Sequence, residues 1–343
     1  MTAVPVLDPA VSYEHLLRLT DAGGLFEHAE LTAPRTEHGY CVDDLARGLV
    51  VLAREPSPTP VLRALATGYL ALVLDAQSPD GRFHNRRNLE GRWTDTPSLE
   101  DCWGRALWGL VSVAARGTDE SQAALALQHF ERGARHRSPH LRADVFGALG
   151  AAEVLTTRPG HAIAEGLLAE TAARLVSLPV EPACPWPEPR LRYANGSVPE
   201  VLLAAGDLLA DQTLLDAGLQ LLAWLLDVET TGDRLSVTPV GGWARAEVRP
   251  GYDQQPIEVA ALADACARAL ELTGDPRWAD SLERCRRWFL GANDTGVMLL
   301  DVSSGGGYDG LMRHGRNENQ GAESTLALIS TLQRGVAARA SRP

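Results

Sequence analysis

The sequence predicts an all-helical toroid of the (α/α)6 type, in which six helical hairpins form an inner and an outer ring. Apolar residues recur at helical spacing along nearly the whole chain and define about twelve helices. The joints between these helices alternate between short and long. Hairpins packed in a ring place all short turns on one face and all long loops on the other, whereas a stack of helical repeats would be more uniform.

The periodicity also gives approximate helix positions. One helix is expected over residues 10–20 and another from Val42 to about Arg54, and strand-like alternation is confined to short pieces such as Arg234 to Val240. The remaining helices are expected over residues 61–75, 104–115, 121–131, 143–156, 162–177, 201–210, 213–227, 257–272, 278–290 and 322–334.

The joints carry the signals expected of helix ends. In the short joint at 273–276, Gly274 is predicted to end one helix, Asp275 to cap the next, and Pro276 to be its first residue. The long joints hold many of the glycines, prolines and aromatic residues, and loops of such length in a compact domain are usually functional. They span residues 76–98, 178–196, 228–254 and 291–317.

The helices that follow long loops are predicted to form the inner ring. They begin near residues 42, 100, 142, 198, 256 and 319. Small residues concentrate in two of them, at 148–152 and 260–265, and small residues allow the close packing that an inner ring needs. We expect residues 1–343 to form one domain of this kind.

Composition narrows the classes of function. The net charge of -12 argues against a nucleic-acid partner, since phosphate binding needs a basic surface. The five cysteines lack metal-site spacing, and we expect neither a metal nor a cofactor. The N-terminus has no signal-peptide pattern, and no apolar run approaches the roughly 18–20 residues of a membrane helix. A cytoplasmic protein without a membrane partner is therefore expected.

Polar clusters open all six predicted inner helices. In a toroid these segments would converge on one mouth, although they lie far apart in the sequence. An acid in a first helical turn is often only a partner of the helix dipole, but here the acids come with amides and aromatic residues. The clusters are HGYCVDDLAR (38–47), SLEDCWGR (98–105), HLRADVFG (140–147), YANGSVPE (193–200), YDQQPIE (252–258) and RNENQGAES (316–324).

This combination is typical of a sugar site. Hydroxyl groups bind acids and amides, sugar faces stack on aromatic rings, and acetal cleavage needs one protonated and one ionised carboxyl group. The candidate acid and base residues are Asp43 or Asp44, Asp101, Asp253 and Glu318. The candidate substrate-binding residues are His38, Tyr40, Arg47, Glu100, Trp103, Arg105, Trp186, Tyr193, Asn195, Trp243, Tyr252, Gln254, Gln255, Glu258, Asn317, Asn319, Gln320 and Glu323. Among these, Tyr40, Trp103, Tyr193 and Trp243 are expected to offer stacking faces.

These motifs resemble a bacterial all-helical family of six-hairpin glycosidase-like proteins. Over residues 25–335, the most specific parts are DQQPIE and NENQGAES. Members are often labelled glycosyltransferases, and they occur beside or fused to glycosyltransferases and near mannoside phosphorylase-type enzymes. The resemblance implies carbohydrate processing, with a glycosyltransferase encoded nearby as a partner. The family commonly has Asn, His and Asp where this chain has Leu45, Trp103 and Ala194.

Three functions remain open at this stage. The first is an enzyme that cleaves a glycosidic bond in an oligosaccharide or glycoside. The second is a non-catalytic glycan-binding module that works with a glycosyltransferase. The third is a sugar epimerase or isomerase, which would need a proton-shuttling histidine at the mouth, either His38 or His140.

Overall fold

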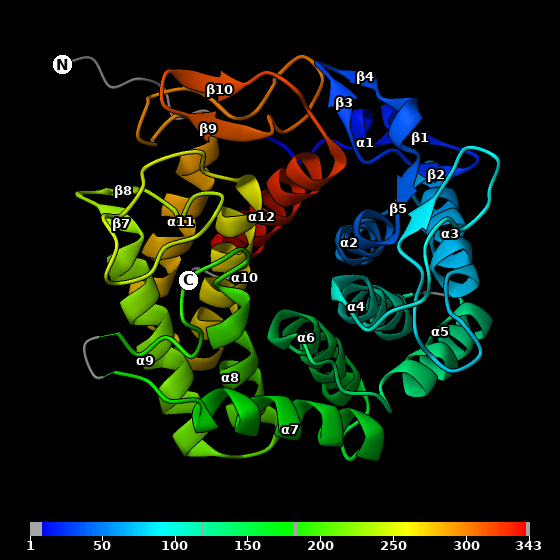
Figure 1. Ribbon diagram of the computed structural model, residues 1–343, viewed down its shortest axis with the longest axis horizontal. Helices are drawn as coiled ribbons and strands as arrows, with labels where there is room; N and C mark the ends of the chain where they lie inside the picture. Colours follow the sequence, from blue (N-terminus) through cyan, green and yellow to red (C-terminus); the bar gives the residue numbers. More distant parts are fainter. Residues whose placement is uncertain (1–8, 118, 182–183, 341–343) are drawn as a thin grey trace.

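The computed structural model describes residues 9–117, 119–181 and 184–340. Within them, six helices form a closed inner ring, seen end-on in Figure 1. Each packs against the next, and the last packs against the first. This arrangement confirms the predicted all-helical toroid. The inner helices are α2 (Val42–Ala53), α4 (Asp101–Arg116), α6 (Leu141–Thr157), α8 (Ser197–Leu208), α10 (Pro256–Thr273) and α12 (Ala322–Ala340).

Five outer helices pack on the inner helix that precedes each of them in the chain, and the remaining one, α1 (Glu14–Arg18), packs on the last inner helix, α12. Helix α1 has only 5 residues, so the predicted helix over 10–20 was too long. The chain instead turns at residues 22–23 into a short strand pair, whose second strand begins at Gly24 with a φ of 144° that favours glycine. The others are α3 (Pro60–Asp75), α5 (Glu120–Gly133), α7 (Ala162–Ser177), α9 (Gln212–Val228) and α11 (Pro276–Phe289).

Glycine allows the inner helices to approach closely. A Cβ atom on Gly104 of α4 would lie 2.1 Å from the carbonyl oxygen of Ala143 in α6. A Cβ on Gly196, just before α8, would lie 2.4 Å from the backbone of Ala261 in α10. Any side chain at either position would force the helices apart. Among the described residues, no helix is both long and apolar enough to cross a membrane.

The two sets of helices begin differently. Five outer helices, α3, α5, α7, α9 and α11, start with a side chain that accepts a hydrogen bond from the first turn. Asp275 caps α11, Pro276 opens it, and Gly274 ends α10 in the left-handed conformation, as predicted. The inner helices α2, α4, α6, α8 and α10 have no side-chain cap. The short turns therefore carry local stabilising signals that the long-loop face lacks.

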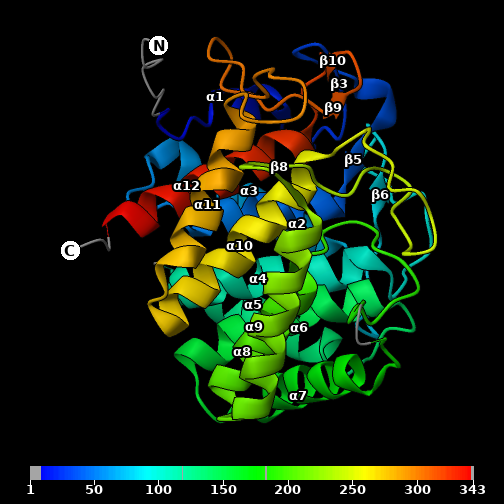
Figure 2. The same cartoon turned by 90° about the vertical axis from the view of Figure 1, so that its left-hand side faces the viewer.

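Short antiparallel strand pairs shape the long connections, several of which gather on one side of the ring in Figure 2. The pair β5–β6 fastens the segment before α2 to the loop that precedes α4. The predicted strand character near Arg234 is confirmed in β8. The pairs are β1 (Thr20–Asp21) with β2 (Gly24–Leu25), β3 (Ala29–Glu30) with β4 (Ala33–Pro34), β5 (Tyr40–Cys41) with β6 (Arg86–Arg87), β7 (Thr230–Thr231) with β8 (Arg234–Leu235), and β9 (Gly310–Met312) with β10 (Gly315–Asn317).

Candidate functional site

A polar pocket opens where three neighbouring inner helices begin. It is formed by the first turns of α2, α4 and α6 together with two long loops, and we call it the mouth pocket. Asp43 and Asp101 therefore line one pocket, although they belong to different helices. The residues lining the mouth pocket are Asp43, Asn85, Glu100, Asp101, Cys102, Pro139, His140, Leu141, Arg142, Glu188, Arg192 and Tyr193.

Asp43 has one bonded and one unbonded carboxylate oxygen. Its Oδ2 accepts a hydrogen bond from Asn85 Nδ2 at 3.1 Å, and its backbone N–H donates to Asn85 Oδ1 at 3.2 Å. Its Oδ1 is buried without a hydrogen bond and forms an ion pair at 3.6 Å with Arg105 Nε, which also makes no hydrogen bond. Polar atoms that lack a hydrogen bond at this depth cost free energy, so they mark a place where a polar substrate group would be favourable.

Asp101 is held by Tyr193, whose phenol hydroxyl donates a hydrogen bond to Asp101 Oδ2 at 2.5 Å. Burial raises the pKa of Tyr193, and the Asp101 charge acts in the same direction, so the phenol stays protonated as the donor. The turn after Tyr193 is anchored by the buried Glu258, which accepts hydrogen bonds from the backbone N–H groups of Ala194 and Asn195. Burial raises the pKa of Glu258 to about 8, against the effect of these donors.

Behind the mouth pocket, a narrow apolar space runs along the ring axis, and we call it the axial cavity. All six inner helices contribute to its wall, and it holds about 590 Å³ of empty space, its opening included. Its lining residues are Ala46, Arg47, Val50, Val51, Arg105, Trp108, Phe146, Ala194, Ser197, Ile257, Ala260, Ala261, Asp264, Glu323, Leu326, Ala327 and Ser330. The Arg105 guanidinium stacks on the Phe146 ring at 3.8 Å, and burial lowers the pKa of Arg105.

Asp44 is not exposed in the pocket. It is buried and bonded to Arg47, whose other terminal nitrogen lies 2.7 Å from Glu323 Oε2. Burial raises the pKa of Asp44 to about 7, and Arg47 opposes this shift. Asp44 therefore holds Arg47 in place, and of the two predicted candidates only Asp43 lines the mouth pocket.

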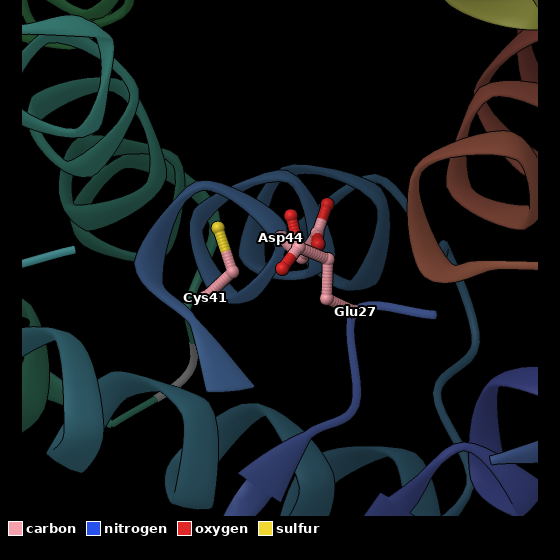
Figure 3. Close-up of side chains that lie close together, drawn as sticks. All are labelled: Glu27, Cys41 and Asp44. Carbon is pink, nitrogen blue, oxygen red and sulfur yellow. The ribbon is translucent and has the colours of Figure 1, made fainter. Parts of the chain in front are cut away.

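One group of possible metal ligands lies beside α2. Glu27, Cys41 and Asp44 lie close together (Figure 3), and each offers a donor atom. These three atoms are within 4.8 Å of one another. Both carboxylates already have arginine partners, Arg86 for Glu27 and Arg47 for Asp44. The Cys41 thiol is buried and its pKa is raised well above the usual range, which disfavours the thiolate that binds metals.

Several predicted residues lie apart from the mouth pocket. Asp253 is exposed in the loop before α10, and Glu318 is exposed and paired with Arg316 at 3.1 Å. His38 lines a separate surface pocket with His28 and Arg86, whereas His140 lines the mouth pocket. The structure thus does not bring Asp253 and Glu318 to Asp43 and Asp101, because each precedes its helix by several residues in a loop that turns outward.

Two of the predicted stacking faces, and one further aromatic residue predicted as a substrate contact, are buried. Tyr40 is packed on Phe26 and donates a hydrogen bond to Asp21 at 2.9 Å. Trp103 is fully buried, with its indole N–H bonded to the Gly133 carbonyl at 3.1 Å. Trp186, proposed as a substrate contact, is 4% exposed and packs on Trp224. These rings stabilise the fold and cannot stack on a sugar in this conformation.

Most of the predicted amides serve the loops. Gln254 is fully buried and bonds Asp294, the Gly251 carbonyl and the Trp288 indole. Gln320 is buried between Asp301 and Ser304. Asn317 accepts a hydrogen bond from the backbone N–H of Asn319, and the Asn319 side chain accepts one from the backbone N–H of Leu31. Asn195 is buried between Arg142 and Glu258.

The remaining predicted contacts lie on other parts of the loop face. Trp243 donates its indole N–H to the Glu247 carbonyl at 3.0 Å, and Tyr252 lies under Arg313. Gln255 precedes α10 as its N-cap residue without a side-chain cap bond. None of these three lines the mouth pocket or the axial cavity. Glu100, Arg105, Tyr193, Arg47 and Glu323 do line one of the two.

The three residues that depart from the family pattern do not all lie at the mouth. Leu45 and Trp103 are fully buried in the core, where an apolar side chain fits. Ala194 lines the axial cavity and has a φ of 49°, a conformation that costs an alanine free energy. Ala194 is thus the one of these three positions at which a different side chain would contact a ligand directly.

Among the residues of the mouth pocket that the sequence did not predict, four are charged or carry an amide. Asn85 and Glu188 lie in the long loops at 76–98 and 178–196, which lack periodicity. Arg142 lies in the polar cluster that opens α6, and its guanidinium bonds Glu188 and Asn195. Arg192 directly precedes the predicted contact Tyr193, and this neighbourhood is the only sequence feature that could have indicated Arg192 as a pocket residue.

Comparison with known proteins places the fold among carbohydrate-processing enzymes. No family model and no curated protein matches the sequence. A sugar epimerase from a ruminal bacterium superimposes with a TM-score of 0.72 at 14% identity, covering 94% of this chain and 95% of that chain. A D-mannose isomerase matches with a TM-score of 0.71 at 12% identity, covering 98% of this chain and 100% of that chain.

Glycoside hydrolases share the fold as well. The GH76 α-mannanase BT2949 of Bacteroides thetaiotaomicron matches with a TM-score of 0.63 at 8% identity, covering 88% of this chain and 87% of that chain. At these identities the likeness concerns the fold alone. The chain thus has the (α/α)6 toroid of carbohydrate-active enzymes, and its reaction has to be argued from its own residues.

Proposed function

We propose that the protein is a carbohydrate-active enzyme that cleaves a glycosidic bond at the mouth pocket. One observation carries this proposal: Asp43 and Asp101, from the first turns of adjacent inner helices, line the same polar pocket. Two carboxyl groups on either side of an acetal are the basic requirement for glycoside cleavage. The shared fold of glycoside hydrolases such as the α-mannanase supports the substrate class.

Each carboxyl group has surroundings that suit one part of the reaction. The Tyr193 hydroxyl donates to Asp101 and so stabilises its ionised form, which suits a base or nucleophile. Asp43, the other carboxyl group of the pocket, is then the proton donor to the leaving oxygen. Arg142 and Arg192, with Asn85, are placed to bind hydroxyl groups around the pocket.

A second function rests on a different residue. His140 lines the same pocket, is exposed, and has no side-chain cap bond. An imidazole can take up and return a proton near neutral pH, as epimerisation or isomerisation of a sugar requires. The likeness to a sugar epimerase and a D-mannose isomerase supports this alternative.

Product analysis in heavy water separates the two reactions. The protein would be incubated with manno- and gluco-oligosaccharides, with and without phosphate, and the products identified by mass spectrometry and NMR. Shortened chains are expected, and phosphorylated products would identify phosphorolysis. Products of unchanged length that carry deuterium at carbon would instead establish epimerisation or isomerisation and overturn the cleavage proposal. Glycan binding without any product would identify a binding module.

A further inference from the structure

We infer that the axial cavity binds the alkyl chain of an amphiphilic glycoside whose sugar occupies the mouth pocket. This inference rests on the proposed function in that it places the sugar at the mouth. It adds a second binding site and a substrate class, a glycoside with an unbranched apolar aglycone.

The wall of the cavity has the chemistry of a site for an apolar group. Val50, Ile257, Ala260, Leu326 and Ala327 line it between its two ends. These side chains offer no hydrogen bond, so a buried sugar ring would lose its water partners without replacement. An alkyl chain loses nothing there and gains by leaving water.

The two ends of the cavity are polar and fix its orientation. At the rim, Arg47 bonds Glu323, and Arg105 stacks on Phe146. At the floor, Asp264 lies 2.9 Å from Arg54 Nη1. The lining of α12 runs from Glu323 to Ser330, a span of seven residue steps and therefore about 10 Å of helix. The apolar section is thus about as deep as a short alkyl chain and ends at charge.

The cavity adjoins the mouth pocket, so one ligand can occupy both. Arg105 lines the cavity, and its Nε lies 3.6 Å from Oδ1 of Asp43, which lines the pocket. Tyr193 lines the pocket, and the next residue, Ala194, lines the cavity. A glycoside with its sugar between Asp43 and Asp101 would direct its aglycone past Arg105 into the apolar section.

Chain length provides the test. The probes are methyl, butyl, hexyl, octyl and dodecyl mannosides and glucosides, each kept below its micelle concentration, with affinity measured by calorimetry. Affinity should rise about fourfold for each added methylene, the gain expected from burying one such group. The rise should stop once the chain reaches Asp264 and Ser330, because a longer chain would displace their polar contacts. Affinity independent of chain length would overturn the inference.

Variants locate the effect. Ala327→Phe, and the smaller change Ala260→Leu, fill the cavity and should reduce the ratio of octyl to methyl affinity at least tenfold. Ala162→Phe, on the exposed surface of α7, is the matched control and should keep the ratio. A ratio that survives both cavity variants in folded protein would mean that the chain binds elsewhere and would overturn the inference. Because binding needs no turnover, absence of cleavage would count against the proposed reaction and not against this site.

Discussion

Inner and outer helices of this toroid begin in opposite ways. Asp119, Asp211 and Asp275 cap outer helices by accepting hydrogen bonds from the first turn. Asp43 and Asp101 occupy first turns of inner helices, yet neither α2 nor α4 has a side-chain cap. The same residue type therefore stabilises a helix on the short-turn face and lines a pocket on the long-loop face.

The difference follows from the connections. A short turn leaves the first-turn N–H groups in water unless a nearby side chain bonds them, so capping acids are favoured there. A long loop covers the inner helix ends and supplies partners itself, as Asn85 does for the Asp43 N–H. Asp43 and Asp101 are thereby left without a capping bond and line the mouth pocket. Each prediction below tests whether acids on the short-turn face stabilise helices while acids on the long-loop face bind a ligand.

The largest effect is expected at the mouth. Asp43→Asn and Asp101→Asn should each lower kcat about 10²–10⁴-fold on the substrate that product analysis identifies, because each removes a proton-transfer group. Stability should change by less than about 1 kcal/mol, since neither side chain caps its helix. Steady-state kinetics and urea denaturation measure the two quantities.

Asp253→Asn and Glu318→Gln are the matched controls for this experiment. Both acids are exposed outside the mouth pocket, and their variants should keep kcat within about threefold. A loss at Asp253 or Glu318 as large as the loss at Asp101 would show that the reaction uses the other side of the ring.

Much of the fold could be predicted because its signals are local. Helical periodicity, the alternation of joints and the motif at 273–276 each depend on residues close in sequence. The predicted inner-helix starts at 42 and 256 coincide with α2 and α10, and that at 100 lies within one residue of α4. The predicted helix over 10–20 was too long because the chain enters the β1–β2 strand pair at Thr20, soon after Arg18.

The site could be predicted only in part because loop conformation is not local. Gln254 and Gln320 look like sugar-binding amides in the sequence, but they satisfy buried groups within the loops. Asp253 and Glu318 precede their helices by a few residues, and that distance is enough to turn them outward. Asn85 reaches α2 from a loop more than forty positions away, as its bond to Asp43 shows, and no pattern indicates such a contact.

The second effect concerns the buried acid of α2. Burial raises the pKa of Asp44 to about 7, whereas an unfolded aspartate titrates near 4. The folded state therefore holds a proton that the unfolded state releases, and this contribution to stability is complete below about pH 4 and disappears as pH rises through about 7. The unfolding free energy of the wild type relative to Asp44→Asn should fall by about 4 kcal/mol between pH 4 and pH 8.

Urea denaturation at several pH values measures this difference. Asp253→Asn, at an exposed position, provides the baseline for the pH dependence of the rest of the protein. A difference between wild type and Asp44→Asn that stays constant over this range would mean that Arg47 keeps Asp44 ionised throughout. Asp44 would then act only as the fixed partner of Arg47.

The smallest effect is expected on the opposite face. Asp211 accepts hydrogen bonds from the N–H groups of Thr213 and Leu214 at the start of α9, so Asp211→Ala should lower the unfolding free energy by about 1 kcal/mol and leave kcat unchanged. The matched inner variant is His140→Ala, at the N-cap of α6, which makes no cap bond and should change stability by less than about 0.5 kcal/mol. Equal losses of stability for the two variants would contradict this difference between the faces, because inner helices such as α6 would then also depend on their N-cap side chains.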